Sequence, residues 1–116
     1  MKKFKGLKIW QEGIEIVTNV YQLTSGFPED EKFGLVSQIR RSAVSIPSNI
    51  AEGYGRNSDS ELSRFLNISR GSSYELETQL IISFNLGYIS SEQLEIIARM
   101  LDIIQGGITN FQKKLK

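Results

Sequence analysis

The chain has 116 residues, and its 14 basic and 13 acidic side chains give a formal net charge of +1 at neutral pH. It contains no cysteine and no histidine, which removes disulfides, thiolate chemistry and the commonest general base and metal ligand. The di-iron sites of four-helix proteins, which pair glutamate with histidine, are removed with them. The length is that of a single domain, residues 1–116, with a core of its own, and the near-neutral charge gives no support for a dedicated nucleic-acid binder.

The beginning of the sequence is basic but does not read as a signal peptide. Gln11, Glu12 and Glu15 interrupt the apolar stretch that begins at Ile9, and no apolar run reaches the length of a membrane span. We therefore expect a cytoplasmic protein with no membrane partner. The basic residues of this segment are Lys2, Lys3, Lys5 and Lys8.

A first helix is predicted over residues 8–25. Apolar residues recur there at helical spacing in two adjacent stripes. Gly26 suits the position after a helix end, and Pro28 forbids continuation. One stripe contains Trp10, Ile14, Val17 and Tyr21, and the other contains Ile9, Ile16, Val20 and Leu23.

A second helix is predicted over residues 31–54, although Pro47 would normally end a helix. Val36, Ile39, Ala43, Ile46 and Ile50 keep steps of three or four straight through the proline. This pattern predicts one helix that is kinked at Pro47. Two helices that meet at Ile46 are the alternative.

Two capping signals mark the remaining helices, which are predicted over residues 59–86 and 91–114. Ser58 with Glu61, and Ser90 with Gln93, have the spacing of a capping box, and Gly87 closes the third helix. No alternating strand pattern of useful length appears. The fold class is therefore all-α, and the short connections predict an antiparallel up-down-up-down four-helix bundle.

The helices carry more apolar surface than one bundle needs. The fourth has a core stripe that includes Leu101 and Ile104 and a second stripe beside it, and the first helix shows the same doubling. A wide core face is one interpretation. We predict instead that the extra surface is buried against other copies in a ring-like homo-oligomer. The predicted interface residues are Val44, Pro47, Ala51, Gly71, Ile96, Met100 and Ile103.

Small polar residues concentrate in the middle of the chain. Helical geometry groups three serines with one arginine and one glutamate on one face of the second helix. The third helix carries three serines within its core stripe. Close helix packing with satisfied hydroxyls, a ligand groove and a subunit interface are the three interpretations. The two sets are Ser37, Arg41, Ser45, Ser48 and Glu52 on the second helix, and Ser69, Ser72 and Ser73 on the third.

These serines do not indicate catalysis. There is no histidine to activate them, and every lysine except Lys32 lies near a chain end. Glu75 and Glu77 are two residues apart, so on a helix they point in nearly opposite directions and cannot share a metal. We expect no enzyme activity, no cofactor and no metal.

Several segments together carry a family resemblance. They are Leu7-Lys-Ile-Trp-Gln11, the long block Gln38-Ile-Arg-Arg-Ser-Ala-Val-Ser-Ile-Pro-Ser-Asn-Ile-Ala-Glu-Gly-Tyr-Gly-Arg56, and Gly71-Ser-Ser-Tyr-Glu-Leu-Glu-Thr-Gln-Leu80. The chain resembles the bacterial four-helix-bundle family encoded in intervening sequences of 23S ribosomal RNA genes. The resemblance implies a pentamer with no known catalytic activity and a role with RNA. The fold is also similar to the accessory protein of diversity-generating retroelements, a basic pentameric barrel that works with a reverse transcriptase.

Two functions remain open from the sequence. The first is binding of RNA or DNA through phosphate contacts, with symmetry multiplying a few basic residues per copy. Its candidates are Arg40, Arg41, Arg56, Arg64, Arg70, Lys113 and Lys114, together with the other terminal lysines. Pairing within the chain, such as Arg56 with Glu52 or Arg70 with Glu77, is the alternative for the arginines. The second function is an adaptor whose ring docks a partner protein, such as a nucleic-acid enzyme.

Overall fold

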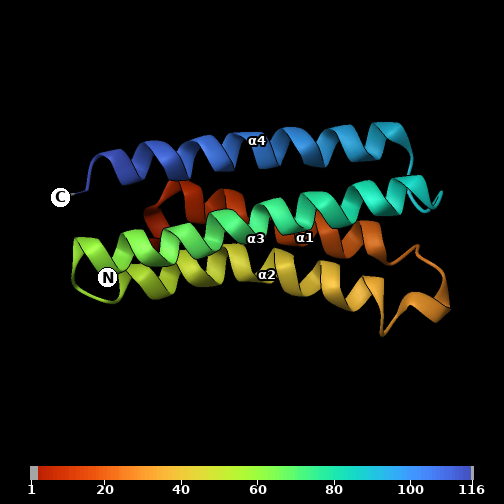
Figure 1. Cartoon of the computed structure of the whole chain (residues 1–116), viewed down its shortest axis with the longest axis horizontal. Helices are drawn as coiled ribbons and strands as arrows, with labels where there is room; N and C mark the ends of the chain where they lie inside the picture. Colours follow the sequence, from red (N-terminus) through yellow and green to blue (C-terminus); the bar gives the residue numbers. More distant parts are fainter. Residues whose placement is uncertain (1–2, 116) are drawn as a thin grey trace.

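Four helices lie along a common axis, and successive helices run in opposite directions (Figure 1). The computed structural model describes residues 3–115, and all its regular elements are helical. This confirms the all-α four-helix bundle. The helices are α1 (Lys8–Thr24), α2 (Leu35–Tyr54), α3 (Asp59–Asn85) and α4 (Ser91–Lys113), with the short 3-10 helices η1 (Lys3–Gly6) and η2 (Glu29–Glu31).

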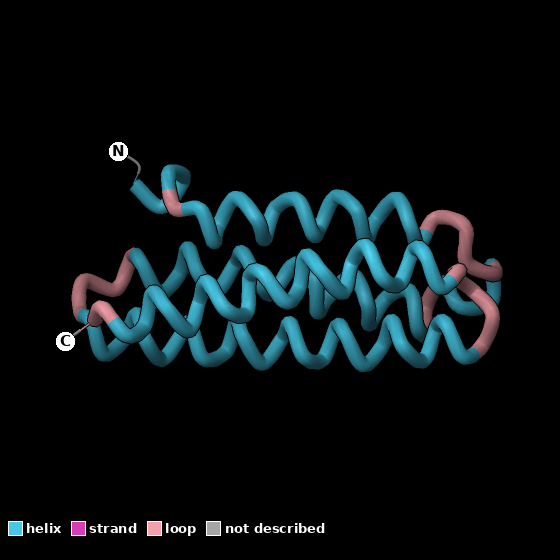
Figure 2. The backbone as a smooth tube through the Cα atoms, turned by 90° about the horizontal axis from the view of Figure 1, so that it is seen from above, coloured by secondary structure: helices cyan, strands magenta, loops and turns pink. Residues whose placement is uncertain are grey.

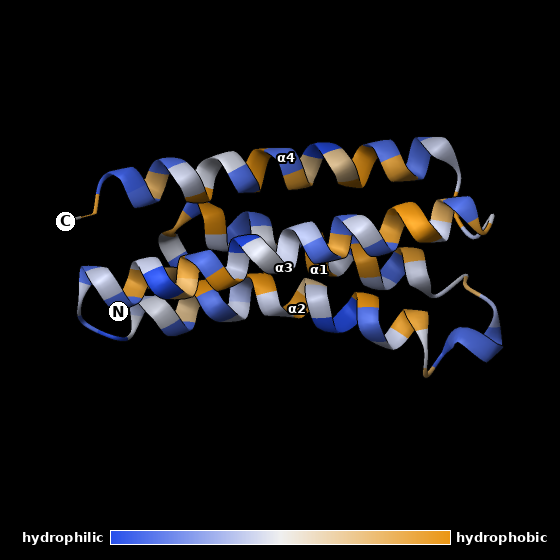
Figure 3. Cartoon of the chain, in the orientation of Figure 1, coloured by the Kyte–Doolittle hydropathy of each residue, from blue (hydrophilic) through white to orange (hydrophobic). Residues whose placement is uncertain are grey.

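Each helix packs against two neighbours, so that α1 and α3 both contact α2 and α4. The connections between the four helices lie at the two ends of the bundle (Figure 2). Apolar residues recur along all four helices (Figure 3), and a stripe on each helix supplies the core. On α1 it is the stripe of Ile9, Ile16 and Val20, whereas Ile14 and Tyr21 of the other predicted stripe are 40% and 42% exposed. None of the helices in residues 3–115 is long and apolar enough to cross a membrane. The fully buried apolar side chains include Ile16, Val20, Ile39, Ile46, Ile50, Leu66, Leu76, Leu80, Leu101, Ile104 and Ile108.

Helix α2 is continuous through Pro47, so the alternative of two helices meeting at Ile46 is wrong. Pro47 is buried and packs against α1 at Gly13, where an added Cβ would lie 3.2 Å from the proline Cβ. The missing side chain at Gly13 therefore makes room for the proline ring. The kink at Pro47 stays a prediction.

The start of α2 differs from the prediction, because the helix begins at Leu35 and not at residue 31. Glu29–Glu31 forms a separate 3-10 turn, and Gly34 breaks the helical backbone with φ −108° and ψ −106°. The Glu31 carboxylate accepts a hydrogen bond from the Leu35 N–H at 3.2 Å. Glu31, which was predicted to be the first residue of the helix, instead lies before it and satisfies the backbone N–H of Leu35 at the helix start.

The two capping signals have different outcomes. Ser90 and Gln93 form the complete reciprocal box, with N···O distances of 2.8 and 3.0 Å. Ser58 accepts from the Glu61 N–H at 3.1 Å, but the Glu61 carboxylate turns to Arg64 instead of returning to Ser58. The prediction of a full box at Ser58 is therefore wrong, because a nearby guanidinium competes for the carboxylate.

Helices α2 and α3 approach each other closely at small residues. A Cβ at Gly53 would lie 2.6 Å from the Cβ of Phe65, which is closer than real Cβ atoms come. Further along, the Ser69 hydroxyl donates to the Ile46 carbonyl at 2.9 Å, across from α3 to α2. The prediction of close packing with satisfied hydroxyls is confirmed for this serine, although its partner lies on the neighbouring helix.

Replacing Gly53 with alanine tests this close approach. We expect Gly53→Ala to lower the free energy of unfolding by about 1–3 kcal/mol, because the new methyl group overpacks the helix contact. Gly106→Ala is the matched control, since a Cβ at this α4 glycine meets nothing within 4 Å. It should raise stability by about 0.5–1 kcal/mol through helix propensity. Urea denaturation measures both, and equal stabilities of the two variants would contradict the close approach.

Candidate functional site

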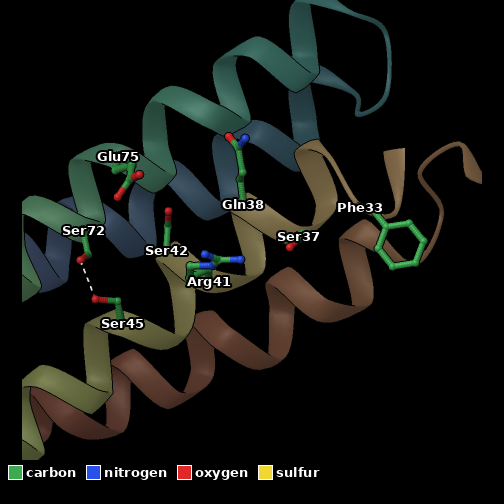
Figure 4. Close-up of a pocket in the computed structure, with 8 residues that line it drawn as sticks. All are labelled: Phe33, Ser37, Gln38, Arg41, Ser42, Ser45, Ser72 and Glu75. Atoms are coloured by element: carbon green, nitrogen blue, oxygen red, sulfur yellow. Dashed lines mark hydrogen bonds between the residues drawn. The ribbon is translucent and has the colours of Figure 1, made fainter. Parts of the chain in front are cut away.

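A polar groove of about 460 Å³ lies between α2 and α3 (Figure 4). We call it the α2–α3 groove. Helical spacing places three of the predicted polar residues, Ser37, Arg41 and Ser45, along its α2 wall. Ser48 and Glu52, predicted on the same face, do not line it. The groove is lined by Phe33, Ser37, Gln38, Arg41, Ser42, Ser45, Ser72 and Glu75.

One end of the groove is closed by a bridge between the two helices. The hydroxyl oxygens of Ser45 and Ser72 are 2.8 Å apart and share a hydrogen bond. The Asn49 amide donates to the Ser45 hydroxyl at 2.8 Å as well. These three polar side chains satisfy one another, and the Ser45–Ser72 bond joins the two helices at this end of the groove.

The other polar groups of the groove have no partner within the described chain. Neither a hydrogen bond nor an ion pair within residues 3–115 involves the side chains of Ser37, Gln38, Arg41, Ser42 or Glu75. Ser42 is only 4% exposed, so its hydroxyl lies at the buried base of the groove. A guanidinium, an amide and hydroxyl donors that face one hollow can bind an oxygen-rich ligand.

Of the predicted binding arginines, Arg41 alone makes no hydrogen bond or ion pair within residues 3–115. Two of the others bond to a neighbouring helix. Arg40 donates to the Thr24 hydroxyl at 2.9 Å and lies 4.3 Å from the centroid of the Tyr21 ring. Arg70 donates to Thr109 and Gln112 of α4, at 3.0 and 2.9 Å. Its expected pairing with Glu77 is wrong, because α4 offers these partners from across the helix interface.

The arginines near the α2–α3 turn are also paired. Arg56 forms the predicted ion pair with Glu52, at 3.1 Å. Arg64 makes two contacts with the Glu61 carboxylate, at 3.1 and 3.2 Å, and these lower the pKa of Glu61. Both guanidinium groups also lie over the Phe65 ring. Arg99, the sixth arginine of the chain, pairs with Glu95 at 3.4 Å.

The terminal lysines lie far from the groove in one copy of the chain. Lys113 and Lys114 are exposed at the end of α4, and both chain ends lie at the opposite end of the bundle from the start of α2 (Figure 1). Lys2 and Lys116 fall outside the described residues. A single chain therefore does not bring Lys113 and Lys114 together with Arg41.

Phe33 is the groove residue that the sequence analysis missed. Its side chain is 89% exposed at the open end of the groove. The segment that carries it is fixed by Glu31, which accepts from the Tyr88 hydroxyl at 2.9 Å as well as from the Leu35 N–H. The hydrogen bond to Glu31 raises the pKa of Tyr88. Periodicity gave no signal for Phe33, because it precedes the helix and belongs to no apolar stripe.

The predicted interface residues differ in how much surface they leave open. Ile96, Ile103 and Val44 are 54%, 60% and 39% exposed, and Gly71 faces open space. Ala51 and Met100 are half-buried. Pro47 is buried within the chain against Gly13, so it has little surface to offer another copy.

The described residues define an all-α bundle protein with a polar groove, and no group of three or more acidic side chains among them could hold a metal. Residues 5–110 match the 23S rRNA-intervening sequence protein family, so the chain belongs to this family.

A crystal structure of a protein of unknown function from the S23 ribosomal protein family of Bacteroides thetaiotaomicron is similar, with a TM-score of 0.81 and 26% identity. The match covers 91% of this chain and 99% of that one. No curated protein sequence matches this chain.

Replacing Arg70 and Arg41 in turn with methionine tests whether Arg70 stabilises the bundle and Arg41 does not. Arg70→Met should lower the free energy of unfolding by about 1–3 kcal/mol, because it removes charge-assisted hydrogen bonds between α3 and α4. Arg41→Met should change stability by less than about 0.5 kcal/mol, since Arg41 makes no such bonds. Chemical denaturation measures both. An equal decrease in the two variants would show that Arg41 is also a structural residue.

Proposed function

We propose that this protein is a non-enzymatic, homo-oligomeric cytoplasmic bundle that binds structured RNA or DNA through phosphate contacts at the α2–α3 groove. The observation that carries the proposal is the free guanidinium of Arg41, beside two unpartnered hydroxyls. The other five arginines are each engaged by a neighbouring carboxylate, hydroxyl or amide. A cation left unpaired in a hollow is available to a phosphate oxygen.

The family supports nucleic acid as the ligand, since its description refers to intervening sequences of 23S rRNA. No base-reading module accompanies Arg41, so recognition rests on charge and shape. One arginine per copy gives weak binding by itself. Several copies in a ring would present several grooves, and the contacts would act together on one nucleic acid.

Assembly is supported by two exposed apolar surfaces on different sides of α1. The α4 surface contains Ile96 and Ile103, which line shallow hollows between α4 and α1. The α1–α2 surface contains Tyr21 and Val44, which line a hollow between those helices. Phe33, Ser37 and Arg41 line this hollow as well as the α2–α3 groove, so the contact with the next copy has to lie on Tyr21 and Val44 and leave those three residues open. A ring needs two different surfaces on each copy, because each interface joins one surface of a subunit to another surface of the next. Two distinct apolar surfaces meet that requirement.

The second candidate function is an adaptor whose assembled ring docks a partner protein. Exposed apolar side chains on α3 favour it, since Tyr74, Ile81 and Ile82 are 53%, 44% and 44% exposed and lie outside both assembly surfaces. This function needs no contact with nucleic acid. Binding measurements with nucleic acid therefore separate the two candidates.

The nucleic-acid proposal is tested by removing one charge at two places. Arg41→Gln should weaken binding to a structured RNA hairpin, and the dependence of log K on log salt should become shallower by about one unit for each phosphate that the variant no longer neutralises. Arg99→Gln removes the same charge from the exposed Arg99–Glu95 pair on α4 and should leave binding unchanged. Fluorescence anisotropy at two salt concentrations measures both. Absence of binding by the unaltered protein at low salt would favour the adaptor.

The assembly proposal is tested by placing a charge on the α4 surface. Light scattering should give the unaltered protein a mass several times the 13.1 kDa of one chain. Ile103→Asp should yield a folded monomer, because a carboxylate would be desolvated in an apolar interface. Leu86→Asp is the control, at a residue that is 54% exposed and lies outside both surfaces. An unaltered protein that is monomeric would refute the assembly.

A further inference from the structure

We propose that the α2–α3 groove binds a nucleotide of an unpaired strand, with the base stacked on Phe33 and the phosphate held by Arg41. This inference rests on the proposed nucleic-acid function and specifies which form of nucleic acid the groove selects. It is built on two features that line the groove, an open aromatic ring at one end and an unpaired guanidinium further along α2 (Figure 4).

The first feature is the exposure of Phe33. At 89% it is far more exposed than the next most exposed large apolar residue, Ile103 at 60%. A phenylalanine in this position leaves nearly its whole ring surface in water, which is unfavourable in an isolated chain. Within residues 3–115, the one group found over the Phe33 ring is the Lys32 ammonium, which lies 5.6 Å from the ring centroid. A flat, apolar base would cover the ring, and the nearby ammonium would favour a ligand that also carries negative charge.

The backbone that carries the ring is also held in place. Glu31, two residues before it, is tied to Tyr88 and to the start of α2 by hydrogen bonds of 2.9 and 3.2 Å. Leu35, two residues after it, begins the helix. Because the backbone on both sides is fixed, stacking on Phe33 costs little ordering of the protein.

The second feature is the set of polar groups next to the ring. Arg41, Ser37 and Gln38 line the same groove and have no side-chain hydrogen bond within the described chain. The guanidinium and hydroxyl can donate to phosphate oxygens. A base on Phe33 and its phosphate on Arg41 thus use the two features that the bundle leaves unsatisfied.

Glu75 narrows the choice of ligand. Its carboxylate lines the groove from α3 and makes no ion pair within residues 3–115. A carboxylate disfavours a ligand that carries only negative charge, such as inorganic phosphate. It favours a ligand that also has N–H or O–H donors, and the ribose hydroxyls and base edges of a nucleotide supply them. In a duplex the base faces are already stacked and the edges are paired, so the groove selects an unpaired segment.

Two RNA probes and four variants, including Arg41→Gln, test the inference. The probes are a labelled oligouridylate of about 12 nucleotides and a blunt duplex RNA of similar length, both at one fixed salt concentration. Phe33→Ala should weaken oligouridylate binding about 5- to 150-fold, the range expected when one base–aromatic stack is removed. Duplex binding should change less than about twofold, because no base in it reaches the ring. Tyr74→Ala removes another exposed aromatic outside the groove, 53% exposed on α3, and should change neither affinity.

The Phe33→Trp variant keeps a stacking surface and adds a signal. It should bind oligouridylate at least as tightly as the unaltered protein, and its added tryptophan fluorescence should be quenched on binding. The contribution of Trp10 is subtracted with the unaltered protein. Absence of quenching at saturation would overturn the stacking contact.

The outcomes separate this inference from the function on which it rests. If Phe33→Ala leaves oligouridylate binding unchanged while Arg41→Gln weakens both probes, the groove binds phosphate but the base contact is wrong. If neither variant affects either probe, the groove is not the nucleic-acid site and both proposals fail. Tighter binding of an acidic peptide than of oligouridylate would also overturn the inference, because it would show that charge alone selects the ligand.

Discussion

The close contact between α2 and α3 is the constraint on which the rest of the site depends. At Gly53 the two helices are too close for a side chain on α2, and at Ser45 and Ser72 they are joined by a hydroxyl bridge. This contact sets the floor of the α2–α3 groove, which extends from the bridge toward Phe33. Without small residues on both helices, the polar residues of α2 and Glu75 of α3 would not line one hollow.

The distribution of ion pairs explains how a chain with a net charge of only +1 can present a binding cation. Arg40 and Arg70 join helices of the bundle, and Arg70 is the clearer case because it connects α3 to α4 through Thr109 and Gln112. Arg56, Arg64 and Arg99 each pair with a carboxylate three or four residues away. Composition counts all of these residues as basic, although some of their donors already bond within the chain. The residue that matters for a ligand is the one whose donors are free, and in residues 3–115 that arginine is Arg41.

The sequence predicted the helices well because the signals are local. Periodicity followed α2 through Pro47, and Ser90 with Gln93 marked the start of α4. Features that depend on the packing partner were not predictable. The Glu31 carboxylate is held by the Tyr88 hydroxyl, and Pro47 packs against Gly13 of α1. Neither contact follows from spacing along the chain. Ser37, Arg41 and Ser45 of α2 were grouped correctly on one face, but Glu75 joins them only because α3 lies on that side, and Phe33 only because of the turn before α2.

The most direct test of the account is to observe the arginine side chains themselves during binding. In a spectrum of ¹⁵N-labelled protein, the Nε–Hε signals of the six arginines report on each guanidinium separately. On titration with a short single-stranded RNA, the Arg41 signal should shift in proportion to occupancy, while the signals of Arg70 and Arg40 stay in place because their donors remain bound within the chain. Shifts at Arg70 or Arg40 with an unchanged Arg41 signal would contradict the account.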